Sequence, residues 1–341
     1  MERETDRGLT IRITLALVFV AVLPVAFVYA FVFAINAIGL DLLAWATGRP
    51  YNGEVHVELW LVVGAVAVGF AAQFFFGDSI ALRSVDARRV EADDRPDLLA
   101  RVDRLAQIAD VERPRVAVSR SDVPNAFTIG ARPSKATLVV TEGALEALED
   151  DELDAVLAHE LARVKNRDVA VMSLSYVLPS LTYLVAIAAF FVLQGIFHVL
   201  GSARHVDDDG AKGLAVAIVV LVVSAVVTMA ISALFWLASF ALFRTLSQYR
   251  EYAADRGAAA ITGEPAALAS ALRTVDDEMS ELPDRDLRSV DGGLEALYVA
   301  PIDDYQFGEE RELISSDIFS STHPSTEERI ERLETMASEG V

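Results

Sequence analysis

The adjacent residues His159 and Glu160 are the pair in this chain whose types best fit catalysis. In one class of zinc site, two histidines at positions i and i+4 share a helix face and bind the metal. The glutamate after the first histidine then removes a proton from a zinc-bound water. Arg163 stands where the second histidine is needed. A guanidinium stays protonated and offers no lone pair, so Arg163 is excluded as a metal ligand.

Two acidic residues later in the chain, Glu251 and Asp255, are candidates to complete such a site. Glu251 follows one long apolar stretch by about eight residues, and Arg163 precedes another by about eight. At about 1.5 Å per helical residue, both lie about 12 Å beyond an apolar segment, which favours a common depth. We expect Glu251 to be a ligand and Asp255 to orient His159 or another ligand. In isolation each of these pairs is also typical of a solvated helix surface.

Four apolar stretches must position these residues. Each lacks charged side chains before its last turn and is long enough to cross a hydrocarbon core, which takes about 20 helical residues. The stretches are 13–40, 59–77, 171–197 and 214–243. We predict four transmembrane helices. The first is too long for the apolar region of a signal peptide, and the absence of internal charges disfavours a transporter.

Basic residues near the ends of these stretches predict their orientation. Arginines and lysines flank the stretches on the side of both termini and both large polar segments, which places these in the cytoplasm. The predicted organisation is a membrane hairpin at 1–82, a cytoplasmic segment at 83–170, a second membrane hairpin at 171–243 and a cytoplasmic segment at 244–341.

The charge balance concerns partners and environment. The formal net charge is -21, and only three residues are lysines: Lys135, Lys165 and Lys212. Acid-rich, lysine-poor surfaces are typical of proteins from salt-loving cells, and the same balance disfavours nucleic acid binding. The chain has no cysteine, which excludes disulfides and thiolate metal sites.

Periodicity and punctuation predict the elements of the two polar segments. Residues 96–109 have the apolar spacing of an amphipathic helix, and 115–119 and 136–141 are β-branched runs typical of strands. Asp150 and Asp151 open a helix through His159, and 242–261 continues the fourth apolar helix. Residues 282–321 predict a lid loop, and Ser325 opens a terminal helix with Ile330 and Leu333 facing inward.

Five motifs occur in order along the chain. They are Asn125-Ala126-Phe127, TLVVTEGAL at 137–145, LAHELARVKNRD at 157–168, EYAAD at 251–255 and THPSTEERI at 322–330. With the four apolar helices, these motifs resemble the HtpX-type membrane metallopeptidases, which are relatives of the prenyl-protein-processing membrane zinc proteases.

The resemblance implies a mainly α membrane protein with four transmembrane helices and a cytoplasmic zincin-like α+β domain with a small sheet. It implies a multi-pass zinc metalloendopeptidase that cleaves membrane or misfolded proteins in quality control. One zinc ion would be bound by His159 and Glu251, with Glu160 as general base and Asp255 beside the ligands. His323 matches a residue that assists transition-state stabilisation. The resemblance also matches one strand to the edge along which an extended substrate pairs: Thr137, Leu138, Val139, Val140 and Thr141.

Arg163 departs from the family pattern, and three outcomes remain open. His159, Glu251 and His323 could form a substitute zinc site, although a fixed cation at Arg163 would repel the metal. Arg163 could instead replace zinc electrostatically by pairing with the carboxylates of the site. The chain would then be a pseudoprotease that binds membrane-protein segments or partners without cutting them. Finally, Arg163 could extend toward solvent or lipid headgroups and leave a weak two-ligand site.

Overall fold

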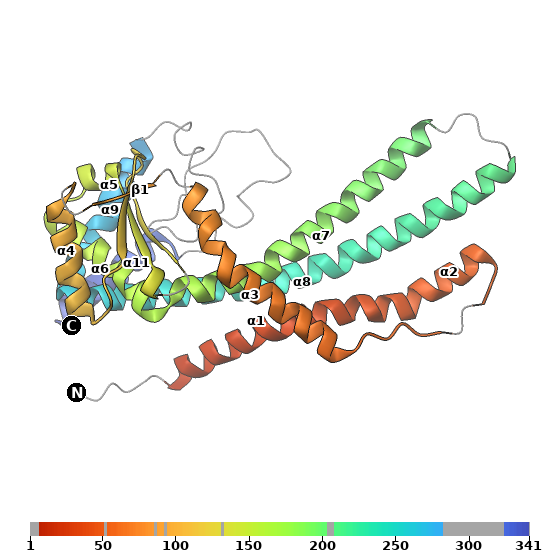
Figure 1. Ribbon diagram of the computed structural model, residues 1–341, viewed down its shortest axis with the longest axis horizontal. Helices are drawn as coiled ribbons and strands as arrows, with labels where there is room; N and C mark the ends of the chain where they lie inside the picture. Colours follow the sequence, from red (N-terminus) through yellow and green to blue (C-terminus); the bar gives the residue numbers. More distant parts are fainter. Residues whose placement is uncertain are drawn as a thin grey trace. The chain divides into compact units, whose positions relative to one another are not determined.

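The computed structural model describes residues 7–50, 53–84, 87–91, 94–130, 133–202, 208–281 and 324–340. It divides into two compact units. Met1–Ala71 and Ser175–Leu242 form what we term the apolar unit, and Ala72–Leu174 and Phe243–Val341 form the sheet unit. The elements run in the order α1 (Arg7–Ala34), the π-helix η1 (Ile35–Gly39), α2 (Leu40–Thr47), α3 (Leu59–Ser84), β1 (Ala87–Arg89), α4 (Pro96–Ala109), β2 (Arg115–Ser119), β3 (Ala126–Ile129), the 3-10 helix η2 (Pro133–Lys135), β4 (Thr137–Thr141), α5 (Glu142–Ala147), α6 (Asp150–Asn166), α7 (Asp168–Ser202), α8 (Asp208–Thr262), α9 (Pro265–Glu281) and α11 (Thr326–Glu339) (Figure 1).

The chain is mainly helical with a small mixed sheet, as the sequence predicts. Among the described residues, two helices are long and apolar enough to cross a membrane, Val18–Thr47 and Leu214–Thr262. Leu59–Ala72 and Leu181–Gly195 are shorter apolar helices in two of the other predicted stretches. Large apolar side chains of the apolar unit are exposed, as expected for surfaces that face hydrocarbon or a partner; examples are Phe33 (74%), Trp60 (69%) and Leu234 (66%).

Helix α8 connects the two units. It has 55 residues, about 80 Å of helix, whereas a hydrocarbon core is about 30 Å thick, so only part of it can lie in a bilayer. The predicted continuation of the fourth apolar stretch through 242–261 is confirmed. In the apolar unit, the Phe27 ring of α1 lies edge-on to the Phe235 ring of α8, with centroids 5.3 Å apart.

The sheet has the strand order β1-β2-β4-β3, with β2 and β4 parallel and the outer pairs antiparallel. The strand predicted at 115–119 is confirmed, and the one predicted at 136–141 begins one residue later, at Thr137. The structure corrects the prediction that Thr137, Leu138, Val139, Val140 and Thr141 form a substrate-binding edge. β4 is an inner strand whose backbone is hydrogen-bonded to β2 on one side and β3 on the other, so it cannot accept an added strand. In the described sheet, β1 and β3 are the edges.

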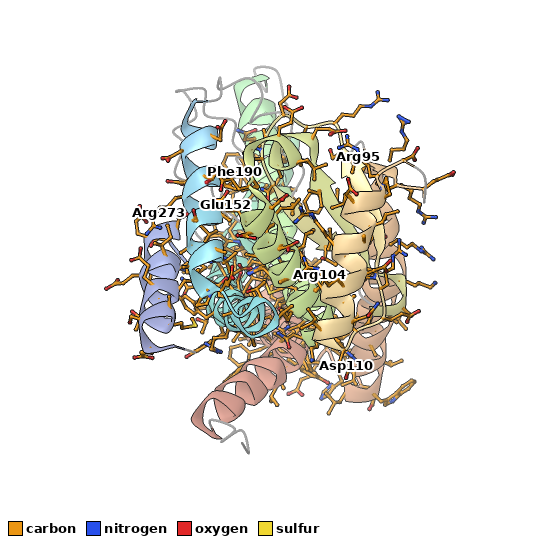
Figure 2. The ribbon with its side chains drawn as sticks, turned by 90° about the vertical axis from the view of Figure 1, so that its left-hand side faces the viewer. Arg95, Arg104, Asp110, Glu152, Phe190 and Arg273 are labelled. Atoms are coloured by element: carbon orange, nitrogen blue, oxygen red, sulfur yellow. The ribbon has the colours of Figure 1, made fainter. Side chains whose placement is uncertain are left out.

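Helix α6 lies at the centre of the sheet unit, where it contacts α4, α9 and β3. Its start is fixed by a capping box in which Glu149 and Glu152 each accept from the other's backbone N–H. The Glu152 carboxylate also accepts from Ser270 and Thr274 of α9, on the side of α6 shown in Figure 2. The core beneath it is aliphatic: Leu105, Leu138, Leu157 and Leu161 are almost fully buried.

The terminal helix α11 begins at the predicted place. The Ser325 side chain caps it by accepting from the Glu328 backbone, and Leu333 is fully buried with Ile330 partly buried. This helix packs against α9. The predicted lid loop at 282–321 and the predicted catalytic residue His323 lie outside the described residues.

Candidate active-site cluster

Helix α6 and the part of α8 that lies in the sheet unit bring the predicted site residues together. Helix α6 carries His159, Glu160 and Arg163, and α8 carries Glu251 and Asp255; all five residues are at most 3% exposed. The chain allows this approach because Gly257 has no side chain. A Cβ at Gly257 would lie 2.5 Å from the Cβ of Ala162 in α6, closer than any real contact.

His159 lies between the two carboxylates of α8. Its Nδ1 is 3.0 Å from Asp255 Oδ1, and its Nε2 is 3.5 Å from Glu251 Oε2. Burial disfavours the charged imidazole, but the Asp255 and Glu251 carboxylates outweigh it and raise the pKa of His159 above its ordinary value. Each ring nitrogen of His159 therefore has a carboxylate beside it.

Arg163 points into the cluster. Its Nη1 donates to Glu160 Oε1 at 3.3 Å and lies 4.0 Å from Glu251 Oε1. Although burial opposes its charge, Glu160 and Glu251 raise the pKa of Arg163, so it is a permanent cation here. The alternative in which Arg163 extends to solvent or lipid headgroups is wrong, because the side chain is only 2% exposed.

The sequence reasoning missed Arg329, a buried cation contributed by α11. Its Nε and Nη2 donate to the two oxygens of Asp255 at 3.0 and 2.7 Å, and its Nη1 lies 3.5 Å from Glu251 Oε2. The side chain is fully buried. The sequence contained one signal for this residue. Arg329 lies on the same buried face of α11 as Thr326 and Leu333, and a charged side chain on a buried face needs an oppositely charged partner.

Acidic and basic side chains are paired within the cluster. Three carboxylates, Glu160, Glu251 and Asp255, face the guanidiniums of Arg163 and Arg329, and His159 lies between two of the carboxylates. Such pairing is what makes six buried polar side chains tolerable in a low-dielectric interior.

The described residues do not fit zinc. A catalytic zinc site needs three protein ligands and an open position, and a guanidinium takes the place of one ligand. Within the described ranges, no group of three or more histidine, cysteine, aspartate or glutamate side chains could hold a metal ion. Burial and repulsion from Arg163 also lower the pKa of the neighbouring Arg250 to about 10, so a second cation beside the cluster is affected by the charge of Arg163.

A cavity of about 220 Å³ adjoins the cluster between α8 and α11. It is lined by Asp255, Tyr252 and Arg332, but not by His159 or Glu160. The Arg332 guanidinium lies 3.9 Å from the centre of the Tyr252 ring. This cavity therefore reaches Asp255, which is paired with Arg329, but it does not reach His159 and Glu160, the residues predicted to act in catalysis.

Comparisons with known proteins place this chain in a family. The model of peptidase family M48 matches residues 92–337. The protein named Protease HtpX homolog 2 of Methanosarcina mazei is 38% identical over 311 residues, which cover 90% of this chain and 93% of that relative. Protease HtpX homolog 1 of Streptomyces coelicolor is 38% identical over 335 residues, covering 98% and 95%. The crystal structure of S. mikatae Ste24p aligns with 92% of this chain and 66% of its own at 18% identity, with a TM-score of 0.43, too low to support a conclusion.

Proposed function

Because the chain belongs to peptidase family M48 and has HtpX homologues over most of its length, we propose that it is an HtpX-type membrane protein that binds substrate segments without hydrolysing them. Its termini and sheet unit lie on the cytoplasmic side, and its apolar helices are embedded in the cell membrane. Its partners are membrane-protein or unfolded-protein segments in quality control. This is the pseudoprotease alternative that Arg163 raised.

The observation that carries this proposal is the position of Arg163. Its guanidinium contacts Glu160, the residue that matches the family's general base, and lies within ion-pair distance of Glu251. An ion pair with Arg163 engages the carboxylate that would have to accept a proton from water, and a neighbouring cation opposes zinc binding. The same residue therefore acts against both requirements of zinc-dependent hydrolysis.

The electrostatic role of zinc is replaced by this arrangement. Zinc would contribute positive charge to the carboxylates, and here the Arg163 guanidinium contributes positive charge beside Glu160 and Glu251. The family architecture then stays stable without metal, because each of the three carboxylates of the cluster has a guanidinium within ion-pair distance. Retained binding with lost hydrolysis is the expected consequence.

A second candidate function is the zinc metalloendopeptidase that the family resemblance implies. It is supported by the relatives, whose names describe them as proteases, and by the proximity of His159 and Glu251 across α6 and α8. Under this candidate one zinc ion is bound despite Arg163, with ligands that include residues outside the described ranges, such as His323.

One experiment separates the two candidates. The full chain and Arg163→His are purified in detergent at high salt, and zinc per chain is measured by mass spectrometry. Binding and cleavage of fluorescent casein, an unfolded protein, are measured on the same samples. Arg167→His is the matched control, because it makes the same change at an exposed residue four positions on.

We expect the original chain and Arg167→His to bind casein without stoichiometric zinc or cleavage. Arg163→His should gain both zinc and cleavage, and Glu160→Gln added to it should remove the cleavage. If the original chain already holds about one zinc per chain and cleaves casein in a Glu160-dependent way, the second candidate is correct. If it neither cleaves nor binds casein, the proposed binding function is wrong.

A further inference from the structure

A pocket in the sheet unit, away from the cluster, has an unusual charge. Its volume is about 240 Å³, and it lies between the start of the sheet and the N-terminal end of α4, where Figure 2 marks Arg95. Its charged lining residues are Arg88, Arg89, Arg95, Arg120, Asp94 and Glu142. Arginines outnumber carboxylates by four to two, whereas the whole chain has 29 basic against 50 acidic residues. A surface shaped only by an acidic composition would not concentrate arginines here.

Both carboxylates of the pocket are already engaged within the protein. Glu142 accepts two hydrogen bonds from Arg95 Nη2, at 2.7 and 2.9 Å, and Asp94 accepts from the backbone N–H of Glu91 at 3.1 Å. Glu142 is therefore paired with Arg95, and Asp94 is hydrogen-bonded to the backbone of the turn. Neither carboxylate is hydrogen-bonded to another arginine that lines the pocket in the described residues.

Three arginines remain: Arg88, Arg89 and Arg120. All three are exposed, and within the described part of the chain none of them forms an ion pair. Among the described residues these three like charges have no ion-pair partner, and like charges repel one another, which costs stability unless an anion binds. The pocket is thus prepared for a negatively charged ligand.

The position of the pocket in the chain suggests where that anion comes from. β1, which carries Arg88 and Arg89, begins three residues after the end of α3, whose first part is apolar. Arg88 follows Ala72, the end of this apolar part, by 16 residues, and basic residues that come near a lipid surface are attracted to anionic headgroups, each contributing about 1 kcal/mol. Chain connectivity therefore keeps these arginines within reach of a lipid surface.

We propose that this pocket binds a phosphate group, carried either by an anionic phospholipid headgroup or by free phosphate. The guanidinium fork matches phosphate oxygens with two parallel hydrogen bonds, which the ammonium group of lysine cannot do. The volume lies below the roughly 300 Å³ at which pockets for drug-sized ligands begin, so it suits a headgroup and not a large metabolite. The site is independent of Arg163 and of any proteolysis.

The test uses the detergent-solubilised full chain and native mass spectrometry. Short-chain phosphatidylglycerol, short-chain phosphatidylcholine and inorganic phosphate are titrated separately at a constant salt concentration that keeps the chain folded. The pocket variant is Arg88→Gln/Arg120→Gln. The matched control is Arg113→Gln/Arg115→Gln, which removes the same charge from exposed arginines that do not line the pocket.

We expect the chain to bind phosphatidylglycerol at least about tenfold more tightly than phosphatidylcholine, and the pocket variant to lose about tenfold while the control stays within about twofold. Arginine-dependent binding of phosphate without a preference for the charged lipid supports the same site with a soluble ligand. If the pocket variant binds both phosphate and phosphatidylglycerol as the original chain does, the proposal is overturned. Circular dichroism of the variants shows that any loss is not a loss of fold.

Discussion

The buried arginine of α11 provides the sharpest test of how the cluster is held. Arg329 is fully buried and donates to both oxygens of Asp255, with Glu251 3.5 Å from a third nitrogen. Replacing it by methionine keeps most of the side-chain volume but removes the cation. Two carboxylates of α8 would then lose their shared partner inside the protein, and the link between α8 and α11 would be lost.

The expected loss of stability follows from the burial of this pair. Removing one partner of a buried, hydrogen-bonded ion pair costs about 3–5 kcal/mol, because the other charge stays buried without compensation. The sheet unit contains roughly 200 residues, and for a domain of that size about 1 kcal/mol changes Tm by about 2–4 °C. We therefore expect Arg329→Met to lower Tm by about 6–20 °C.

Arg273→Met is the matched control. Arg273 of α9 pairs with Glu334 of the same helix α11, but both side chains are about half exposed, at 49% and 55% (Figure 2). An exposed pair contributes about 1 kcal/mol or less and is screened by salt, so this variant should lose less than about 4 °C. Thermal unfolding by circular dichroism at two salt concentrations separates the two effects, since the buried pair is screened much less.

The double variant Arg329→Met/Asp255→Asn adds a second criterion. Neutralising Asp255 removes one of the two orphaned charges, so the double variant should be more stable than Arg329→Met alone. If Arg329→Met costs no more than Arg273→Met, and the added Asp255→Asn brings no recovery, then the buried guanidinium does not stabilise the cluster and our electrostatic account is wrong.

Two further predictions concern the approach of the helices and the protonation of the site. Gly257→Ala should destabilise the sheet unit by about 1–3 kcal/mol, because its Cβ would lie 2.5 Å from that of Ala162. Adding Ala162→Gly should restore the stability. Gly64→Ala is the control and should not destabilise the protein in thermal unfolding, because a Cβ there has nothing within 4 Å. Because the folded-state pKa of His159 is raised, its contribution to stability is full below its unfolded value of about 6.5 and is lost as pH rises through the folded value. The pKa of Asp255 is lowered, since Arg329 and His159 outweigh the opposing effect of burial. Its contribution to stability therefore depends on pH in the opposite direction, and it is lost only as pH falls below the ordinary aspartate range. Unfolding temperatures measured from about pH 6.5 to pH 9 should fall for the original chain and stay flat for His159→Gln, and equal slopes would contradict this assignment.

Local sequence signals predicted the elements that local interactions determine. The helix at 96–109 and the strand at 115–119 have the predicted bounds, because proline at a helix start, apolar spacing and β-branched runs act over a few residues. The strands β1 and β3 were not predicted. They have three and four residues, too few for a period to be recognised, and they are strands because neighbours distant in the chain pair with them.

The sequence predicted which residues form the candidate site, but it did not predict which side chains pair with one another. His159, Glu160, Glu251 and Asp255 were identified from residue type and spacing, and the structure brings them together with Arg163. The resemblance matched β4 to an edge strand, but β4 is an inner strand, because strand order is decided by which strands pair across the sheet and not by the residues of one strand.

By itself, the sequence determined the family, the apolar helices and the absence of a second metal-binding histidine at Arg163, since each depends on residue identity along the chain. Only the tertiary structure decided what that arginine does. Its direction into the cluster depends on α8 packing closely at Gly257, and the partner of Asp255 is Arg329, 74 residues further on. The partner of a buried charge is the opposite charge that the fold brings within a few ångströms, because charges interact strongly in the low dielectric of the interior.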